Sequence, residues 1–151
     1  MTQSLLIAGA SVRSAVDSAL RAGFKPLAID QYNDEDLRQR CPCHRIEHYP
    51  SQLVEISQQI PPLPWIYTGG LEKHPQIVDQ VSCRHHLLGN PGSVLQQACN
   101  PFLIQQTLAD HDLHYPLTRT DWSPKLPGRW LRKSIHSTGG KGVQWANQGI
   151  N

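Results

Sequence analysis

The residues best suited to chemistry in this sequence form the basic, glycine-rich stretch "WLRKSIHSTGGKGVQW" at positions 130–145. Small residues leave backbone N–H groups unhindered, and such groups can wrap phosphate oxygens. The stretch therefore predicts two strands joined by a phosphate-binding loop, although an ordinary β-hairpin with a glycine turn has the same pattern. It is not a P-loop, because Gly142 follows the Gly-Lys pair where a Ser or Thr is required. The candidate nucleotide-binding residues are Lys133, Ser137, Thr138, Gly139, Gly140, Lys141 and Gly142.

A second candidate loop, "YTGGLEKHP", follows an apolar run at residues 64–67. It combines two glycines, a hydroxyl and three neighbouring ionisable groups. This is more polar chemistry than a turn needs only to connect two elements. Glu72 and His74 could bind or orient a polar substrate. A solvated loop with charged surface residues is the alternative. The candidate substrate-binding residues here are Thr68, Gly69, Gly70, Glu72 and His74.

A third candidate loop begins at Gly9, and its substrate-binding candidates are Gly9, Ser11 and Arg13. A dinucleotide-binding fingerprint would be G-x-G-x-x-G, whereas serines replace its second and third glycines here. Small residues at a helix start still let backbone N–H groups meet an anion. Asp30 lies about where the ribose-binding acid of such a fold would be. The alternative is a tight turn without a ligand.

Cysteine and histidine occur together in "CPCH" at residues 41–44, but their spacing is not that of a zinc site. Cys83 and Cys99 stand alone, so no second cysteine pair completes a metal-binding set. His85 and His86 would point to opposite faces of a strand and could not chelate together. We therefore expect no metal site.

The elements that must position these loops alternate between strand and helix over about ninety residues, a pattern of parallel α/β folds. In such a sheet ligands bind beside the carboxyl ends of the strands. Both candidate substrate loops, the one at Gly9 and the one at Thr68, lie at such ends. The sequence therefore predicts an α/β domain with a Rossmann-like parallel sheet flanked by helices. The expected strands are residues 4–10, 25–29, 45–49, 64–67 and 86–88, and the expected helices are 14–22, 33–40, 52–59 and 75–83.

The pattern changes after residue 91, so we predict one domain over residues 1–91 and a second segment over residues 92–151. The second segment begins with helices, followed by a short β-hairpin tail. The expected helices are residues 92–98 and 101–111, and the strand-like runs are residues 115–120 and 129–133.

Composition excludes several classes of protein. Of the 151 residues, 38% are hydrophobic and 17% charged, which suits a chain with a core and not a disordered one. The net charge is +2 and Lys and Arg do not cluster, so nucleic acid is not an expected partner. No apolar run is long enough for a membrane span. Without a basic segment ahead of an apolar one, the sequence predicts a cytoplasmic protein with reduced cysteines.

The order of these parts resembles the ATP-grasp superfamily. Its members begin with a Rossmann-like pre-ATP-grasp domain, pass through helices, and enter a nucleotide-binding module through a "W-L-x-K-P" strand and a "GG-x-G" loop. The segments "GASVRSA" and "YTGGLEKHP" look like a branch found in bacteria with methanopterin-linked one-carbon metabolism. The residues that match the two module motifs are Trp130, Leu131 and Lys133, then Gly139, Gly140 and Gly142.

This resemblance implies an ATP-dependent ligase in which a carboxylate substrate becomes an acyl phosphate and is then attacked by an amine or thiol. By analogy, Lys133 contacts the adenine or the α-phosphate, and the glycine loop at residues 139–142 closes over the phosphates. The complete family architecture uses ATP and Mg²⁺, because phosphoryl transfer requires charge neutralisation. The residues of the two candidate substrate loops, the one that begins at Gly9 and the one that contains Thr68, would bind the carboxylate substrate.

The sequence departs from the family pattern in three places. Ser134 replaces the proline after the motif lysine, and Pro101 and Phe102 stand where family members often carry a lysine. The magnesium ligands of the family lie downstream of the glycine loop and are not among these 151 residues. We therefore expect this chain alone neither to retain ATP or Mg²⁺ nor to catalyse a reaction.

Several alternatives remain open at the level of sequence. A partner chain could supply the rest of the ATP-grasp module, and a homodimer is also compatible with the sequence. A free-standing Rossmann-like module that binds a nucleotide or small metabolite is the second interpretation. The third is a remnant with only a folding role.

Overall fold

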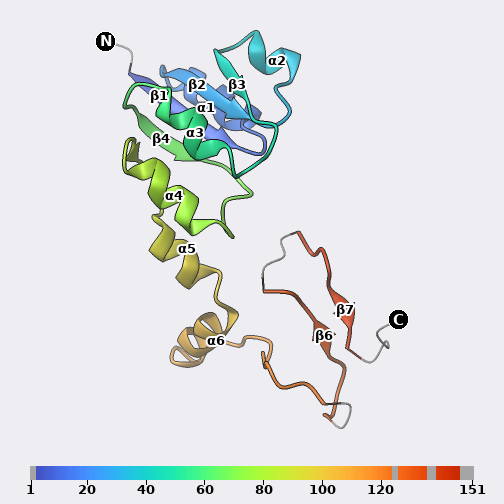
Figure 1. The fold of residues 1–151 in the computed structure, drawn as a ribbon. Helices are drawn as coiled ribbons and strands as arrows, with labels where there is room; N and C mark the ends of the chain where they lie inside the picture. The colour runs from blue at the N-terminus through green and yellow to red at the C-terminus, as the bar shows by residue number, and fades with distance from the viewer. Residues whose placement is uncertain (1–2, 124–125, 136–138, 147–151) are drawn as a thin grey trace. The chain divides into compact units, whose positions relative to one another are not determined.

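The computed structural model describes residues 3–123, 126–135 and 139–146 (Figure 1). Two compact units divide the chain, Met1–Leu95 and Gln96–Asn151.

Within the described residues, the first unit contains a five-stranded parallel sheet in the order β3-β2-β1-β4-β5. The central strand β1 pairs with β2 from Ser4↔Lys25 to Gly9↔Asp30. The strands are β1 (Ser4–Gly9), β2 (Lys25–Asp30), β3 (Cys43–Arg45), β4 (Pro64–Tyr67) and β5 (His86–Leu87).

Helices cover both faces of this sheet, so the unit has three layers (Figure 1). Side chains alternate between the faces, because successive residues of a strand point to opposite sides. Leu6 and Ala8 pack into the hydrophobic cluster under α3 and α4, while Leu5 and Ile7 pack into the cluster under α1 and α2. The helices are α1 (Arg13–Arg21), α2 (Glu35–Arg38), α3 (Leu53–Gln58) and α4 (Pro75–Ser82).

Two helix boundaries follow directly from sequence. Gly23, with φ +83°, ends α1: its N–H donates to Leu20 and the N–H of Phe24 donates to the carbonyl of Ala19, as in a Schellman motif. Pro75 occupies the first turn of α4, where a missing N–H costs no hydrogen bond. These two residues set where the first and fourth helices stop and start.

The predicted fold class is confirmed, with small errors at element boundaries. The third strand was expected at residues 45–49, but β3 covers Cys43–Arg45. Its register explains the difference, because Cys43 pairs with Ala28 and Arg45 with Asp30, the last residue of β2. Gln52 is the N-cap residue of α3, and the hydroxyl of the preceding Ser51 donates to the carbonyl of His48.

The second unit contains less regular structure. Helix α5 (Gly92–Ala98) crosses the division between the units, and α6 (Pro101–Ala109) follows after Asn100, whose side chain accepts hydrogen bonds from the first turn. Strands β6 (Leu131–Arg132) and β7 (Gln144–Trp145) pair antiparallel, which confirms the predicted hairpin. The strand expected at residues 115–120 is wrong, because those residues form no strand and are almost all exposed. Among the described residues, no helix is long and apolar enough to cross a membrane.

Candidate functional site

The strand order places the loops after β1 and β4 side by side. From β1 the chain adds β2 and β3 on one side, then crosses to add β4 and β5 on the other. Such a reversal opens the crevice in which parallel α/β sheets bind ligands, at the carboxyl ends of the strands. The two loops that carry the candidate substrate-binding residues therefore meet at this point.

Hydrogen bonds join the two loops directly. The hydroxyl of Thr68 donates to the carbonyl of Ser11 at 3.0 Å, and the N–H of Ala10 lies 3.5 Å from the carbonyl oxygen of Gly69. Gly9 is required here, because a Cβ at this position would overlap the Thr68 side chain. The structure thus brings together Gly9, Ser11, Thr68 and Gly69, although sequence separates the two pairs by more than fifty residues.

Asp30 holds the β1–α1 turn in place. Its side chain is buried, and its carboxylate accepts hydrogen bonds from the backbone N–H groups of Val12 (2.8 Å), Tyr32 (2.8 Å) and Asn33 (2.7 Å). Charge-assisted hydrogen bonds of this kind are stronger than neutral ones. Because both oxygens are occupied within the protein, Asp30 is not positioned as a free acid for a ribose, and the dinucleotide interpretation loses its expected carboxylate.

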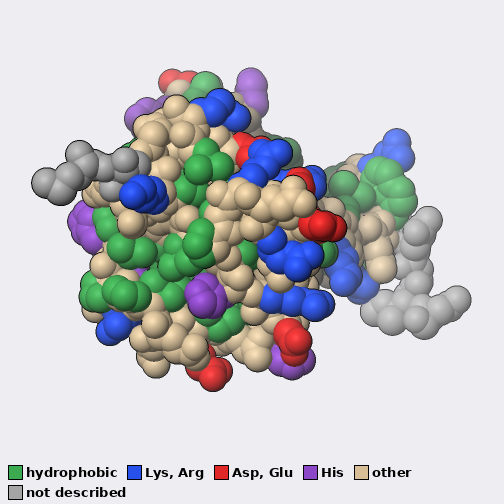
Figure 2. Space-filling view, turned by 90° about the horizontal axis from the view of Figure 1, so that it is seen from above, with side chains coloured by type: hydrophobic (Ala, Val, Ile, Leu, Met, Phe, Trp, Pro, Cys, Tyr) green, Lys and Arg blue, Asp and Glu red, His purple; other side chains and the backbone are tan. Residues whose placement is uncertain are grey.

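Arg13 and His74 do not join the other candidates. The Arg13 guanidinium lies 3.6 Å from Asp34 and 3.4 Å from Asp36, so it pairs with the segment around α2. Figure 2 likewise shows basic and acidic side chains next to one another on one face. His74 is the N-cap residue of α4, where its carbonyl accepts the N–H groups of Ile77 and Val78.

Glu72 lies beside two tyrosines at the edge of the β4 loop. Its Oε2 accepts the N–H of Gly70 at 2.8 Å. The Tyr49 hydroxyl donates to the carbonyl of Gly69 at 3.3 Å, and the Tyr67 hydroxyl donates to the carbonyl of Asn90 at 2.7 Å. These three side chains, all half-buried, form what we call the Glu72–tyrosine cluster.

Burial and the Glu72 charge both act on the tyrosines. Burial raises the pKa of Tyr49, the negative charge of Glu72 raises it further, and the N–H of Ala10 opposes them by hydrogen bonding to the hydroxyl. The pKa of Tyr67 is also raised, first by burial and then by Glu72. Both phenols therefore stay protonated at neutral pH. Sequence reasoning did not select them, since Tyr49 is twenty residues from its partner Gly69.

Burial and nearby negative charge both act on Cys41 and Cys43. Burial raises the pKa of Cys41, and Asp30 raises it further. The pKa of Cys43 is raised to about 12 by burial and by the negative charges of Asp30 and Cys41, against a small opposing effect of Arg38. Both thiols are therefore protonated at neutral pH. No group of three His, Cys, Asp or Glu side chains in the described residues could hold a metal ion.

The candidate nucleotide-binding residues belong to the second unit. Lys133 follows β6 directly and Lys141 lies in the turn before β7, and both side chains are exposed. Gly139, Gly140 and Gly142 have φ values of +62°, +74° and +77°, which other residues adopt only with strain. Ser137 and Thr138 lie outside the described residues.

Side chains brace the hairpin that carries this loop. The Arg129 guanidinium lies over the Trp145 ring, 4.3 Å from its centroid. The side chains of Arg132 and Gln144 form a hydrogen bond of 3.2 Å across the two strands. The connection that contains the glycine loop therefore runs between two paired strands.

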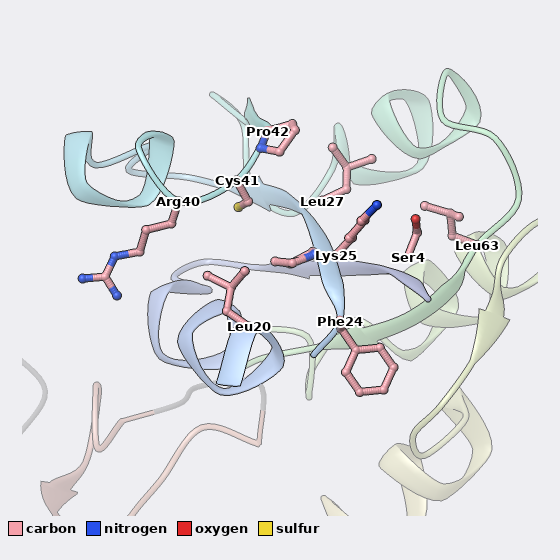
Figure 3. Close-up of a pocket in the computed structure, with 10 residues that line it drawn as sticks. Ser4, Leu20, Phe24, Lys25, Leu27, Arg40, Cys41, Pro42 and Leu63 are labelled. Carbon is pink, nitrogen blue, oxygen red and sulfur yellow. The ribbon is translucent and has the colours of Figure 1, made fainter. Parts of the chain in front are cut away.

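A hollow of about 390 Å³ opens at the opposite edge of the sheet, near the amino ends of the strands (Figure 3). Ser4, Lys25 and Leu63 lie at or just before the starts of β1, β2 and β4, and apolar side chains surround them. The Arg40 guanidinium points away from the others in Figure 3 and pairs with Asp17. None of the candidate residues lines this hollow, so we do not assign it to the site.

No protein-family model matches the sequence, and no curated protein is similar to it at a significant level. Solved structures do match the fold. The biotin carboxylase domain of 2-oxoglutarate carboxylase from Hydrogenobacter thermophilus, a dimer crystallised with MgADP, ADP and bicarbonate, matches 96% of this chain with a TM-score of 0.72 and 11% identity. An N5-carboxyaminoimidazole ribonucleotide synthetase in complex with ADP matches 74% with a TM-score of 0.55 and 14% identity. The corresponding synthetase from Staphylococcus aureus, also with ADP, matches 73% with a TM-score of 0.53 and 14% identity.

The chain is therefore structurally similar to the N-terminal part of ATP-grasp enzymes, and the predicted resemblance is confirmed for the fold. It spans 37% of the carboxylase domain and 29% and 30% of the two synthetases. The similarity thus concerns the α/β unit and the segment that follows it.

Proposed function

We propose that this chain is the N-terminal part of an ATP-grasp ligase-like protein that joins a carboxylate to an amine or thiol. The observation that carries the proposal is the match of 96% of the chain to a domain that binds MgADP and bicarbonate. In this proposal the first unit is the pre-ATP-grasp domain. The segment beyond it begins the nucleotide-binding module.

The substrate would bind where the loops after β1 and β4 meet. This position is favoured because parallel sheets bind ligands at the carboxyl ends of their strands. The hydrogen bond from the Thr68 hydroxyl to the carbonyl of Ser11 holds the two loops in one arrangement. The substrate-binding residues we propose are Gly9, Ser11, Thr68, Gly69, Gly70 and Glu72.

The nucleotide would bind at the β6–β7 hairpin. Lys133 brings positive charge to the end of β6 and Lys141 brings it to the glycine loop itself, where the exposed glycines leave their backbone N–H groups unhindered. These are the groups that can hold phosphate oxygens. With Mg²⁺ bound in a complete module, the nucleotide would supply the phosphoryl group that activates the carboxylate.

A nuclear magnetic resonance titration tests this assignment on the full chain. We expect MgADP to shift the backbone amide signals of Lys133 and Gly139–Gly142 with weak, millimolar affinity, because this chain supplies only part of the site. The Lys133→Ala variant should lose most of the shift at the glycine loop. Lys25→Ala is the matched control, since Lys25 is exposed on the first unit and should leave binding unchanged.

NAD distinguishes the free-standing Rossmann-like module from the proposed function. If NAD shifts the amides of Gly9–Arg13 while MgADP leaves the hairpin unaffected, the ligase-like proposal fails. We also expect no phosphate release from ATP by the pure chain. Sustained release that depends on Lys133 would contradict the prediction that the chain is not catalytic alone.

A further inference from the structure

The Glu72–tyrosine cluster has used its hydrogen-bond donors internally. A tyrosine hydroxyl has one donor and two acceptor lone pairs. The Tyr49 hydroxyl donates to the carbonyl of Gly69, and the Tyr67 hydroxyl donates to the carbonyl of Asn90. The groups left to meet a ligand are therefore acceptors: Glu72 Oε1, the lone pairs of the Tyr67 oxygen, and the one lone pair of the Tyr49 oxygen that the N–H of Ala10 does not use.

Two of these acceptors, on Tyr49 and Glu72, border the same short piece of backbone. A Cβ on Gly70 would lie 2.9 Å from Cε1 and 3.2 Å from the hydroxyl oxygen of Tyr49, and one on Gly69 would lie 3.6 Å from Glu72 Oε1. Tyr67 ends β4 two residues before Gly69, and its ring packs against Trp65 with centroids 5.7 Å apart. Each acceptor is thus held by the backbone or by a packed ring.

Among the ion pairs of the described residues, none involves the Glu72 carboxylate. Lys73 and His74 follow it directly in sequence, yet neither forms an ion pair with it in the described part of the chain. Arg13, the candidate cation of the facing loop, pairs with Asp34 and Asp36 instead. A half-buried carboxylate therefore stands beside two aromatic rings, which are groups that attract cations.

We infer that the Glu72–tyrosine cluster binds a substrate through a cationic nitrogen group, an ammonium or a guanidinium. Such a group donates several hydrogen bonds and carries positive charge, so it complements a set of acceptors around one carboxylate. This inference rests on the proposed function and narrows its substrate to an amine-bearing carboxylate. The cluster would hold the cationic end, leaving the carboxylate end for the reaction.

Three matched probes test the inference on the full chain by nuclear magnetic resonance: butylammonium, butanol and pentanoate. Butylammonium should shift the amide signals of Gly70 and Glu72 and the ring signals of Tyr49 and Tyr67. Butanol and pentanoate should leave them in place. If butylammonium has no effect at these positions, or pentanoate has the larger one, the inference is wrong.

The Glu72→Gln variant separates charge from structure. An amide oxygen still accepts the N–H of Gly70, so the loop should keep its shape while its negative charge is lost. We expect butylammonium affinity to fall by about tenfold. Glu55→Gln removes an exposed carboxylate from α3 and should change nothing. Equal binding by Glu72→Gln and the unmodified chain would overturn the inference.

The butylammonium titration and the MgADP titration can fail separately. An effect of MgADP on the hairpin without any effect of butylammonium would remove this inference and leave the proposed function. A butylammonium effect without any nucleotide effect would remove the proposed function and leave cation binding by the cluster.

Discussion

At the scale of single residues, one buried carboxylate organises the turn between β1 and α1. Asp30 accepts three backbone N–H groups, one from Val12, which is eighteen residues away. The sequence placed an acid at this position but suggested a ligand as its partner. Sequence could not reveal the real partners, because they are backbone groups brought close only by strand pairing.

Replacing Asp30 with Asn should destabilise the first unit by about 2 kcal/mol, because one N–H would face an amide donor and remain unsatisfied in the interior. Asp34→Asn is the matched control: its ion pair with Arg13 is exposed, so the cost should stay below about 0.5 kcal/mol. Urea denaturation followed by circular dichroism measures both. Equal stability of the two variants would contradict this role of Asp30.

Cys43 should react slowly with alkylating reagents. With a pKa of about 12 in place of 9, its thiolate fraction at pH 8 is roughly a thousandfold smaller. Because that pKa is raised, the reaction rate should still increase about tenfold per unit between pH 9 and 11. Iodoacetamide labelling followed by peptide mass spectrometry should find the exposed Cys83 modified first. Labelling of Cys43 before Cys83 at pH 8 would refute this order.

At the scale of elements, the strongly apolar strands were the easiest to predict. Strand β1 is buried almost throughout and reads as a continuous apolar run, while β4 has the same limits in sequence and structure. Strand β3 is short and mostly exposed, so its apolar pattern was too weak to locate it. Residues 115–120 alternate apolar with other side chains but pair with none of the strands that the structure describes, which sequence alone could not show.

The junction between α4 and α5 depends on Asp79, whose Oδ1 accepts the N–H of Gly92 at 2.9 Å. Gly92 suits this junction, since a Cβ there would lie 2.6 Å from the carbonyl oxygen of Pro75. The Asp79→Ala variant should lose about 1 kcal/mol, as when a helix cap is removed. Hydrogen exchange should accelerate at Gly92.

A matched variant on the same helix checks that effect. Gln80 is exposed on α4, so Gln80→Ala should leave exchange at Gly92 unchanged. If exchange in α5 is the same in both variants, the first turn of α5 does not depend on Asp79.

At the scale of the whole molecule, the two units differ in how they bury apolar side chains. The first unit has a hydrophobic cluster on each face of its sheet. The second leaves large apolar residues exposed, including Leu113 (57%), Leu117 (63%) and Leu131 (56%). Exposed apolar residues gathered in one segment are typical of surfaces that bind another protein surface. The sequence indicated the change of character near residue 91 but not this difference in burial.

Residues 1–95 should therefore fold alone. We expect this piece to unfold cooperatively in urea, with a midpoint close to that of the first transition of the full chain. The dye ANS, which binds exposed apolar surface, should fluoresce more with the full chain than with residues 1–95. A non-cooperative transition of the shorter piece would show that the second unit is needed for folding.

The hydrogen bonds from Thr68 to Ser11 and from three backbone amides to Asp30 have a consequence for ligand recognition. These bonds order the β1–α1 turn and the loop after β4 in the absence of a ligand. A ligand would therefore bind a preorganised surface, and little free energy would be lost in ordering it. Selectivity would then depend on neighbouring side chains such as Glu72. These side chains can change during evolution without breaking the hydrogen bonds of Thr68 and Asp30 that order the two turns.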